Sequence, residues 1–212
     1  MNILVIGGGG MVGVKLIERL AKDGRLGDAP VSRIIRQDVV LSPPPPASAF
    51  PIETLIGDLS TPGEAEKLVA LKPDVIFHLA AIVSGEAEAD FEKGYRINLD
   101  GTRYLFEAIR KVGGGYKPKV VFTSSIAVFG APFPEAIPDE FFNTPLTSYG
   151  TQKLICEHLI SDYTRKGYID GRSARLMTVT VRPGKPNGAA SSFFSGIIRE
   201  PLAGVASVCP VD

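Results

Sequence analysis

The chain has 212 residues, enough for one domain with a substantial hydrophobic core. Lysine plus arginine number 23, as do aspartate plus glutamate, so no charge excess indicates a nucleic-acid or acidic-membrane partner. Cys156 and Cys209 have no second cysteine or histidine at metal-ligand spacing, which argues against a disulfide framework and a metal site. No apolar run reaches the ~18 residues of a membrane span. The chain begins on a strand-like run, so we expect a cytoplasmic protein.

Short apolar runs alternate along the chain with segments of helical period, which is typical of a parallel sheet covered by helices. The expected strands are Asn2–Ile6, Ser32–Gln37, Ile52–Ile56, Val75–His78, Lys119–Thr123 and Met177–Val181. The expected helices are Met11–Asp23, Glu64–Leu71, Asn98–Val112 and Tyr149–Lys166, with a shorter helical pattern at Ser192–Arg199. The sequence therefore predicts an α/β fold with a doubly wound parallel sheet, the Rossmann arrangement.

The pattern changes after residue 182, where glycine and proline interrupt the periodicity. We expect residues 1–182 to form a nucleotide-binding domain. Residues 183–212 are expected to begin a small substrate-covering region that is incomplete in this chain. The four prolines Pro43–Pro46 predict a surface connection between the second and third strands.

A glycine-rich loop follows the first strand. Gly7, Gly10 and Gly13 satisfy one phosphate-loop spacing, and Gly8, Gly10 and Gly13 satisfy another. Glycine is needed where a strand turns sharply into a helix and backbone N–H groups approach a pyrophosphate, because a Cβ atom there would block the approach. The positive end of the following helix favours the same anion. A tight turn without a ligand remains the alternative interpretation.

Asp38, at the end of the second strand, is placed to accept hydrogen bonds from both ribose hydroxyls of adenosine. A carboxylate repels the 2′-phosphate of NADP, so NAD is the expected cofactor. The neighbouring Arg36 leaves NADP open, because a basic group near that ribose would attract the phosphate. Asp58 is placed either for the adenine edge or as the cap of the next helix.

Tyr149 and Lys153 lie four residues apart at the start of an expected helix, so their side chains share one face. A nearby ammonium group favours the phenolate and is expected to lower the tyrosine pKa toward the range of an acid/base catalyst. Ser125 ends the fifth strand, where its hydroxyl can bind the reacting oxygen; Ser124 offers the same group one residue earlier. His78 is expected to be a structural core residue.

Taken together, these features resemble the extended short-chain dehydrogenase/reductase superfamily over nearly the whole chain. The resemblance is carried by GGGGMVG, GDLS, VIFHLAA, RINLDGT, SSIAVFG, SYGTQK and VRPG. It implies Ser125, Tyr149 and Lys153 as the catalytic residues. It implies NAD contacts from Gly7, Gly10, Met11, Val12, Gly13, Asp38, Asp58, Leu59, Leu79, Ala80, Ala81, Asn98, Tyr149, Lys153 and Pro183. It also implies a homodimer built from the helices Asn98–Val112 and Tyr149–Lys166.

Within this superfamily, four segments are similar to the D-erythronate dehydrogenase subgroup: AAIVSGEAEADF, VFGAPFP, SYGTQK and RPGKPNGAASSFFSGIIREPL. That similarity implies NAD-dependent oxidation of a hydroxyl on a small sugar acid. The candidate substrate contacts are then Ser84, Ser125, Asn187 and Arg199. The alternative interpretations are a loop cap for Ser84, a turn residue for Asn187 and a solvated charge at a helix end for Arg199.

Two departures argue against a nucleotide-sugar enzyme. Lys185 stands three residues after Arg182, where such enzymes usually carry asparagine, and Ile126 follows the strand-five hydroxyl, where a sugar dehydratase needs an acid. A nucleotide-sugar 4-epimerase remains the alternative enzyme. A nucleotide-sensing module without turnover is the alternative from another class, disfavoured because Tyr149 and Lys153 are both present.

Overall fold

The computed structural model describes residues 1–40, 44–184 and 189–210. In this part of the chain, six parallel strands form the main sheet in the order β5-β4-β1-β6-β7-β8. These strands are β1 Asn2–Ile6, β4 Arg33–Asp38, β5 Ile52–Ile56, β6 Val75–His78, β7 Lys119–Ser125 and β8 Asp170–Leu176. The short strands β2 Arg25–Leu26 and β3 Ala29–Pro30 pair antiparallel outside it. The order reverses between β1 and β6, as the predicted doubly wound fold requires.

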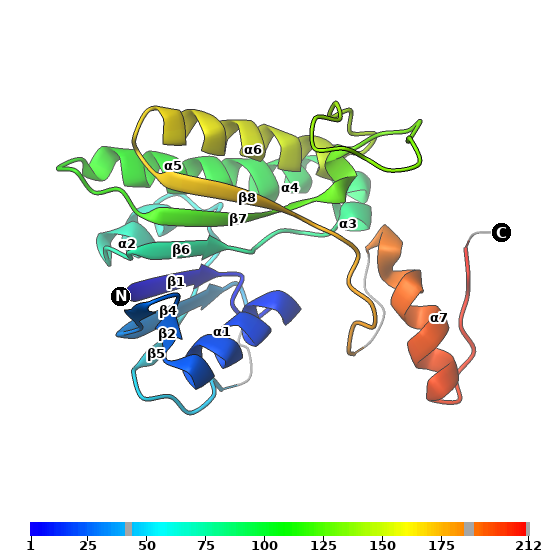
Figure 1. Cartoon of the computed structure of the whole chain (residues 1–212), viewed down its shortest axis with the longest axis horizontal. Helices are drawn as coiled ribbons and strands as arrows, with labels where there is room; N and C mark the ends of the chain where they lie inside the picture. The colour runs from blue at the N-terminus through cyan, green and yellow to red at the C-terminus, as the bar shows by residue number, and fades with distance from the viewer. Residues whose placement is uncertain (41–43, 185–188, 211–212) are drawn as a thin grey trace.

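Helices cover both faces of the sheet (Figure 1). The α-helices are α1 Met11–Asp23, α2 Glu64–Ala70, α3 Ser84–Ala89, α4 Phe91–Gly94, α5 Gly101–Val112, α6 Ser148–Arg165 and α7 Phe193–Leu202. Shorter turns are the π-helix Tyr95–Asp100 and the 3-10 helices Ile126–Val128 and Ala190–Ser192. Helices α5 and α6 lie side by side over one face, while α1 packs against the other and α7 lies beyond the carboxyl ends of the strands (Figure 1).

Strand β1 contributes side chains to the hydrophobic cores on both faces of the sheet. Leu4 and Ile6 point into the core under α2, α5 and α6, whereas Ile3 and Val5 point into the core under α1. All four side chains are fully buried. Because successive residues of a strand face opposite sides, a strand covered on both faces must be apolar at every position. This requirement explains the uninterrupted apolar runs of the central strands.

The expected sixth strand was wrong. The strand is β8, Asp170–Leu176, and the apolar run Met177–Val181 follows it as an irregular segment. Strand β8 is the edge of the sheet and has a mostly exposed, polar sequence. Only a few residues separate β8 from the end of α6 at Arg165, and this short connection sets the pairing of β8 with β7. The segment Met177–Val181 lies next to two cavities that are described below.

The expected helix from Asn98 to Val112 was wrong at its beginning. A π-helix spans Tyr95–Asp100 and continues directly into α5 at Gly101. Helix α7 runs to Leu202, three residues beyond the expected end, and α3 was not expected. Within the described ranges, we find no helix long and apolar enough to cross a membrane.

Candidate functional site

The glycine loop joins β1 to α1 at the carboxyl edge of the sheet. Gly7 adopts a positive φ of 83°, and the N–H groups of Gly7 and Gly8 both donate to the Gln37 carbonyl, at 2.9 and 3.0 Å. A Cβ atom on Gly7 would lie 2.6 Å from the Ala80 nitrogen, and one on Gly13 would lie 2.3 Å from the Gly7 oxygen. Glycine is therefore required at both positions by close backbone packing.

Gly10 differs from its neighbours, because an added Cβ would meet the Gly7 oxygen only at 3.4 Å. It is the N-cap of α1, and no side chain caps this helix end. The first N–H groups of α1 thus remain directed toward the loop, where the partial positive charge of the helix favours a phosphate. The cradle fits the pyrophosphate of a dinucleotide.

Asp38 lies beside this loop in a cavity of about 300 Å³, here named the Asp38 cavity. Its carboxylate accepts hydrogen bonds from the N–H groups of Gly9 at 2.8 Å and Val39 at 2.7 Å. These bonds hold the negative charge at the end of β4, next to the glycine loop. The lining also includes Gly7, Gly10, Asp58, Leu59, Leu79 and Ala80, all of them expected cofactor contacts.

Arg36, the residue that left NADP open, is only 4% exposed. Its side-chain stem packs against Gly8, and its guanidinium donates to Thr54 Oγ1 at 3.0 Å. It is not among the described residues that line the Asp38 cavity. The charge facing this cavity from the end of β4 is therefore the carboxylate of Asp38, which supports NAD over NADP.

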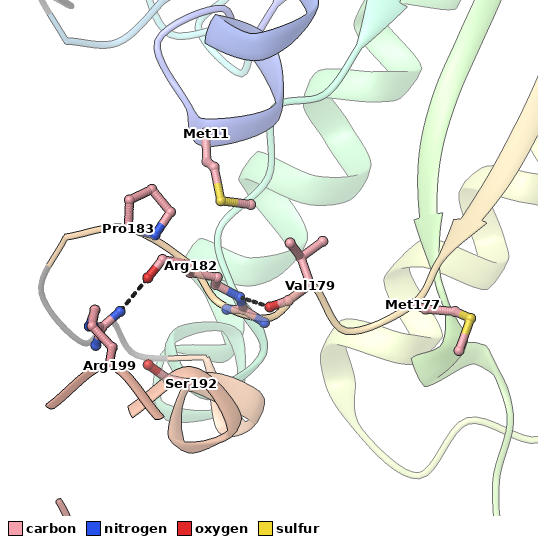
Figure 2. Close-up of a pocket in the computed structure, with 7 residues that line it drawn as sticks. All are labelled: Met11, Met177, Val179, Arg182, Pro183, Ser192 and Arg199. Atoms are coloured by element: carbon pink, nitrogen blue, oxygen red, sulfur yellow. Dashed lines mark hydrogen bonds between the residues drawn. The ribbon is translucent and has the colours of Figure 1, made fainter. Parts of the chain in front are cut away.

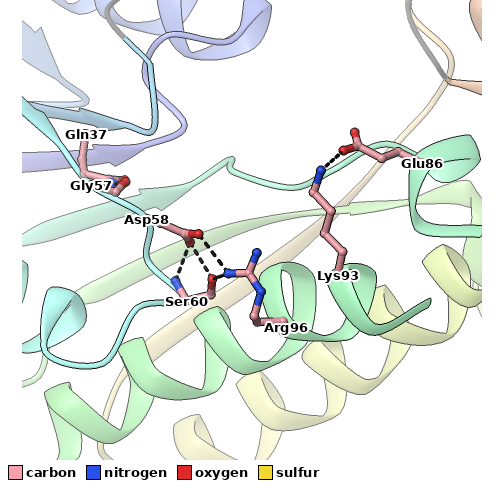
Figure 3. A network of polar contacts seen from close by, with 7 residues as sticks. All are labelled: Gln37, Gly57, Asp58, Ser60, Glu86, Lys93 and Arg96. Carbon is pink, nitrogen blue, oxygen red and sulfur yellow. Dashed lines mark hydrogen bonds and ion pairs between the residues drawn. The ribbon is translucent and has the colours of Figure 1, made fainter. Parts of the chain in front are cut away.

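Asp58 is held by a small polar network (Figure 3). Its carboxylate accepts from the Ser60 N–H at 2.9 Å, the Ser60 hydroxyl at 2.6 Å and the Arg96 guanidinium at 3.0 Å. Burial raises the pKa of Asp58, but these hydrogen bonds outweigh it and hold the pKa below its usual value. The cap of α2 is Gly63, so the helix-cap interpretation of Asp58 was wrong. Asp58 lines the Asp38 cavity, as its proposed role at adenine requires.

Asn98 is buried and clamps the segment after β6. Its amide oxygen accepts from the Ile82 N–H at 2.9 Å, and its amide nitrogen donates to Gln152 at 2.8 Å. Asn98 therefore shapes the cavity wall through Ile82. His78 is also buried, bonded to Thr102 Oγ1 at 2.9 Å, and burial followed by the charge of Lys153 lowers its pKa to about 3. A neutral core histidine agrees with the structural role expected for it.

Tyr149, Lys153 and Ser125 meet in a second cavity of about 520 Å³, here named the Tyr149 cavity. Thr147 caps α6 by accepting from the Gly150 N–H at 3.1 Å, which places Tyr149 in the first turn. The ammonium of Lys153 donates to the Thr123 carbonyl at 2.8 Å and lies 5.6 Å from the centre of the Tyr149 ring. The three predicted side chains are thus brought together at the ends of β7 and α6.

The structure distinguishes the two serines that end β7. Ser124 is buried and its hydroxyl donates to Glu157, on the side of the sheet that faces α6. The hydroxyl of Ser125 accepts from the Ala127 N–H at 3.1 Å and lies next to the phenol of Tyr149, whose pKa it lowers. Ser125 is therefore the hydroxyl available to a ligand beside Tyr149.

The expected effect of Lys153 on Tyr149 is not what the structure has. Burial raises the pKa of Tyr149, and the Ser125 hydrogen bond and the charge of Arg182 only partly lower it. Lys153 is itself 2% exposed, and burial lowers its pKa to about 8. Because an ammonium at this depth is strongly disfavoured, its attraction for a phenolate does not dominate here.

Arg182 was not singled out from the sequence. It lines the Tyr149 cavity, and apart from Lys153 it carries the only charge among the described lining residues. Its guanidinium donates to the Val179 carbonyl at 3.2 Å and to the Ser191 hydroxyl at 2.8 Å. The available sequence signal was its position after the expected last strand, at the carboxyl edge of the sheet, where ligand contacts gather.

A third cavity, of about 210 Å³, lies between the start of α1 and helix α7 (Figure 2). Met11, Pro183 and Arg199 line it, together with Arg182, which borders both this cavity and the Tyr149 cavity. Arg199 donates to the Arg182 carbonyl at 2.6 Å and pairs with Glu200. The structure thus places Arg199 apart from Tyr149, while Asn187 and Lys185 lie outside the described residues.

The Asp38 cavity and the Tyr149 cavity adjoin each other. Leu79, Ala81 and Ile82 line both the Asp38 cavity and the Tyr149 cavity, and the remaining predicted residues Val12 and Ser84 line the latter. A trough therefore runs from the acid at the end of β4, past the glycine loop, to Tyr149. This is the path that an extended dinucleotide needs between its adenosine and its reactive end. No cluster of metal ligands occurs in the described part of the chain.

Three similar proteins cover the whole chain. D-erythronate dehydrogenase of Cupriavidus necator is 47% identical over 215 residues, and that of Haemophilus influenzae is 43% identical over 212 residues. The crystal structure of the nucleoside-diphosphate-sugar epimerase from Agrobacterium tumefaciens is 64% identical, with a TM-score of 0.94. The chain spans 65% of the length of each curated relative and 63% of the crystallised one.

A family match covers almost the same extent. Residues 3–210 match the NAD dependent epimerase/dehydratase family, whose description contains the expected cofactor. The match includes the glycine loop, Asp38, Ser125, Tyr149 and Lys153. The chain therefore belongs to the NAD dependent epimerase/dehydratase family.

Proposed function

We propose that this chain is the cofactor-binding and catalytic part of an NAD-dependent dehydrogenase that oxidises a hydroxyl group of a small sugar acid, such as D-erythronate, to the oxo acid. The observation that carries the proposal is the meeting of Tyr149, Ser125, Lys153 and Arg182 at one end of a trough whose other end carries Asp38. The two relatives named D-erythronate dehydrogenase, at 47% and 43% identity over the whole chain, support the substrate class.

The catalytic residues divide the work around one hydroxyl group of the substrate. Ser125 and Tyr149 hydrogen-bond the reacting oxygen, and Tyr149 accepts its proton while the carbon loses a hydride. NAD, when bound, supplies the hydride acceptor. Lys153 would hold the nicotinamide ribose, and its ammonium, 5.6 Å from the centre of the Tyr149 ring, offsets part of the cost of forming the phenolate. The carbon loses a hydrogen with both bonding electrons, the oxygen loses a proton, and the alcohol becomes a carbonyl.

Arg182 is the proposed partner of the substrate carboxylate. An arginine presents a planar fork that matches a carboxylate, and Arg182 is partly exposed, whereas the other cation of the Tyr149 cavity, Lys153, is only 2% exposed. This assignment adds to Ser84, which lines the same cavity, and it leaves Arg199 as a support that holds the Arg182 backbone. Replacing Arg182 with methionine is expected to raise the KM for the sugar acid by about 10-fold to 100-fold, as for a charged hydrogen bond of about 1.5–3 kcal/mol.

A nucleotide-sugar 4-epimerase is the second candidate, favoured by the name of the 64% identical crystal structure. Both activities begin with the same hydride transfer, but an epimerase returns the hydride and releases no NADH. The two candidates therefore differ in net NADH formation.

The test supplies the protein with D-erythronate, other small sugar acids and UDP-sugars, each with NAD and with NADP, and records absorbance of the reduced cofactor. We expect NADH to accumulate with a sugar acid and the Tyr149→Phe variant to lose that activity, because the variant lacks the proton acceptor. Sugar inversion without NADH would favour the epimerase. Full activity of Tyr149→Phe would contradict the catalytic assignment.

We also infer a homodimer formed through α5 and α6, which lie side by side on one face of the sheet (Figure 1). Light scattering coupled to size exclusion tests it by giving the mass in solution, and a monomer mass at micromolar concentration would reject it.

A further inference from the structure

The partly buried ion pair between Glu157 and Arg175 has no part in the proposed chemistry. Ser124 pairs with Arg175 across β7 and β8, and Ser125 pairs with Leu176. Because neighbouring residues of a strand face opposite sides, Ser124 and Arg175 share the face covered by α6. Leu176 lines the Tyr149 cavity beside Ser125. Ser124 lines this cavity too, so the strand end that bonds Glu157 also borders the ligand site.

Glu157 connects this face to the catalytic helix. It follows Tyr149 and Lys153 at intervals of four residues, so the three occupy one stripe of α6. Its carboxylate accepts from the Ser124 hydroxyl and from Arg175, at 2.8 Å from Nη2 and 3.1 Å from Nε. The side chain of Glu157 is 11% exposed, so the contact is largely shielded from water. One carboxylate thus joins α6, β7 and β8.

Arg175 extends the connection to the cavity wall. Its guanidinium lies 4.9 Å from the centre of the Phe129 ring. Phe129 lines the Tyr149 cavity, and its other neighbour is Phe141, with ring centres 5.9 Å apart. The ring therefore contacts both a guanidinium and a second aromatic ring, just beyond the turn that Ser125 caps.

We propose that Arg175 is a positioning residue for catalysis: paired with Glu157, it fixes Phe129 as a wall of the substrate end of the site and aligns the Ser125 strand end with the Tyr149 helix. In its kinetic consequences this inference rests on the proposed dehydrogenase function. A guanidinium suits this geometry, because it bonds Glu157 through two nitrogens while its carbon lies 4.9 Å from the centre of the Phe129 ring.

The decisive variant is Arg175→Lys, which keeps a positive charge for Glu157 but loses the plane that contacts Phe129. We expect kcat/KM for the sugar acid to fall about 10-fold to 100-fold, the usual effect of a small misplacement at the reacting centre. The KM for NAD should change less than about twofold, because Phe129 does not line the Asp38 cavity. Arg172→Lys is the matched control, since Arg172 forms an exposed ion pair with Asp170 on the same strand.

A double-mutant cycle tests whether Arg175 acts through the ring. Phe129→Leu shortens the wall and leaves the ion pair untouched. If the proposal holds, adding Arg175→Lys to Phe129→Leu lowers kcat/KM by less than about threefold further. Independent, multiplicative losses would overturn the proposed route, and an Arg175→Lys protein with lowered thermal stability but unchanged kinetic constants would show a structural role only.

Hydrogen exchange gives a readout that needs no substrate. The Phe129 N–H donates to the Ile126 carbonyl at 3.1 Å, and the Ala127 N–H donates to Ser125. We expect faster exchange in residues 126–130 of Arg175→Lys, with the exchange of α1 unchanged, and no change in Arg172→Lys. Unchanged exchange in residues 126–130 of Arg175→Lys would reject the positioning role. A wild-type protein without dehydrogenase activity would reject the proposed function, and the exchange measurement would still test the positioning role.

Discussion

Replacing Lys153 with methionine is expected to stabilise the fold while removing the activity. The wild-type ammonium is 2% exposed, and burial lowers its pKa from the usual 10.5 to about 8. A shift of this size corresponds to a free-energy penalty of about 3 kcal/mol for keeping the group charged at neutral pH, at 1.36 kcal/mol per unit. Methionine loses the hydrogen bond to the Thr123 carbonyl, which costs about 1 kcal/mol. The net gain for the variant is then about 2 kcal/mol at pH 7.

The sign of the pH dependence follows from the lowered pKa. Between pH 8 and 10.5 the unfolded chain still holds the proton that the folded chain has released, so this residue makes the wild-type free energy of unfolding rise with pH. The advantage of Lys153→Met should therefore be full below pH 8 and disappear as the pH approaches 10.5.

Urea unfolding of both proteins at several pH values from 7 to 10 measures this difference directly. Lys117→Met serves as the control, because Lys117 is exposed and its loss should change the free energy of unfolding by less than about 0.5 kcal/mol. A Lys153→Met variant less stable than the wild type at pH 7 would refute the reasoning. So would a stability difference that stays constant across the pH range.

Two further predictions concern the cofactor trough. Gly13→Ala is expected to destabilise the fold by up to about 2 kcal/mol in urea unfolding, because its Cβ would lie 2.3 Å from the Gly7 oxygen, and overpacking of about 1–3 kcal/mol offsets the gain in helix propensity of about 1 kcal/mol. Gly101→Ala, whose Cβ would meet its nearest neighbour at 3.4 Å, is the control and should be neutral or stabilising. Asp38→Ser is expected to raise the kcat/KM ratio of NADP over NAD at least about 10-fold, since it removes the carboxylate that repels the 2′-phosphate; an unchanged ratio would contradict the role of Asp38.

The central strands and the order of the candidate site residues could be predicted because each follows from a local rule. Leu4 and Ile6 must be apolar since they lie between two layers, and a strand end carrying Gly7 or Asp38 lies at the carboxyl edge whatever the rest of the fold does. The spacing of Tyr149 and Lys153 likewise places both on one side of a helix before any tertiary contact is known.

The edge of the sheet could not be predicted in this way. Strand β8 needs few apolar residues because much of it is exposed, and Arg175 lies in it through a contact with Glu157 that is 18 residues away in the chain. The low pKa of Lys153 could not be predicted from the sequence either, because it depends on how deeply the side chain is buried and not on the neighbouring tyrosine. Arg182 acquires its place beside Tyr149 from an irregular segment, for which periodicity carries no signal.

The π-helix at Tyr95–Asp100 constrains the number of residues in this part of the chain. A π-turn contains one residue more than an α-turn, and one residue of an α-helix corresponds to a rotation of about 100°. Deleting a single residue there would restore a regular helix and turn everything before the deletion by that angle relative to α5. The Asn98 amide bonds Ile82, in the segment after β6, and Gln152, in α6. After such a rotation Asn98 could not keep both hydrogen bonds. Length variation among natural sequences should therefore be rarer in this turn than in the surface loops.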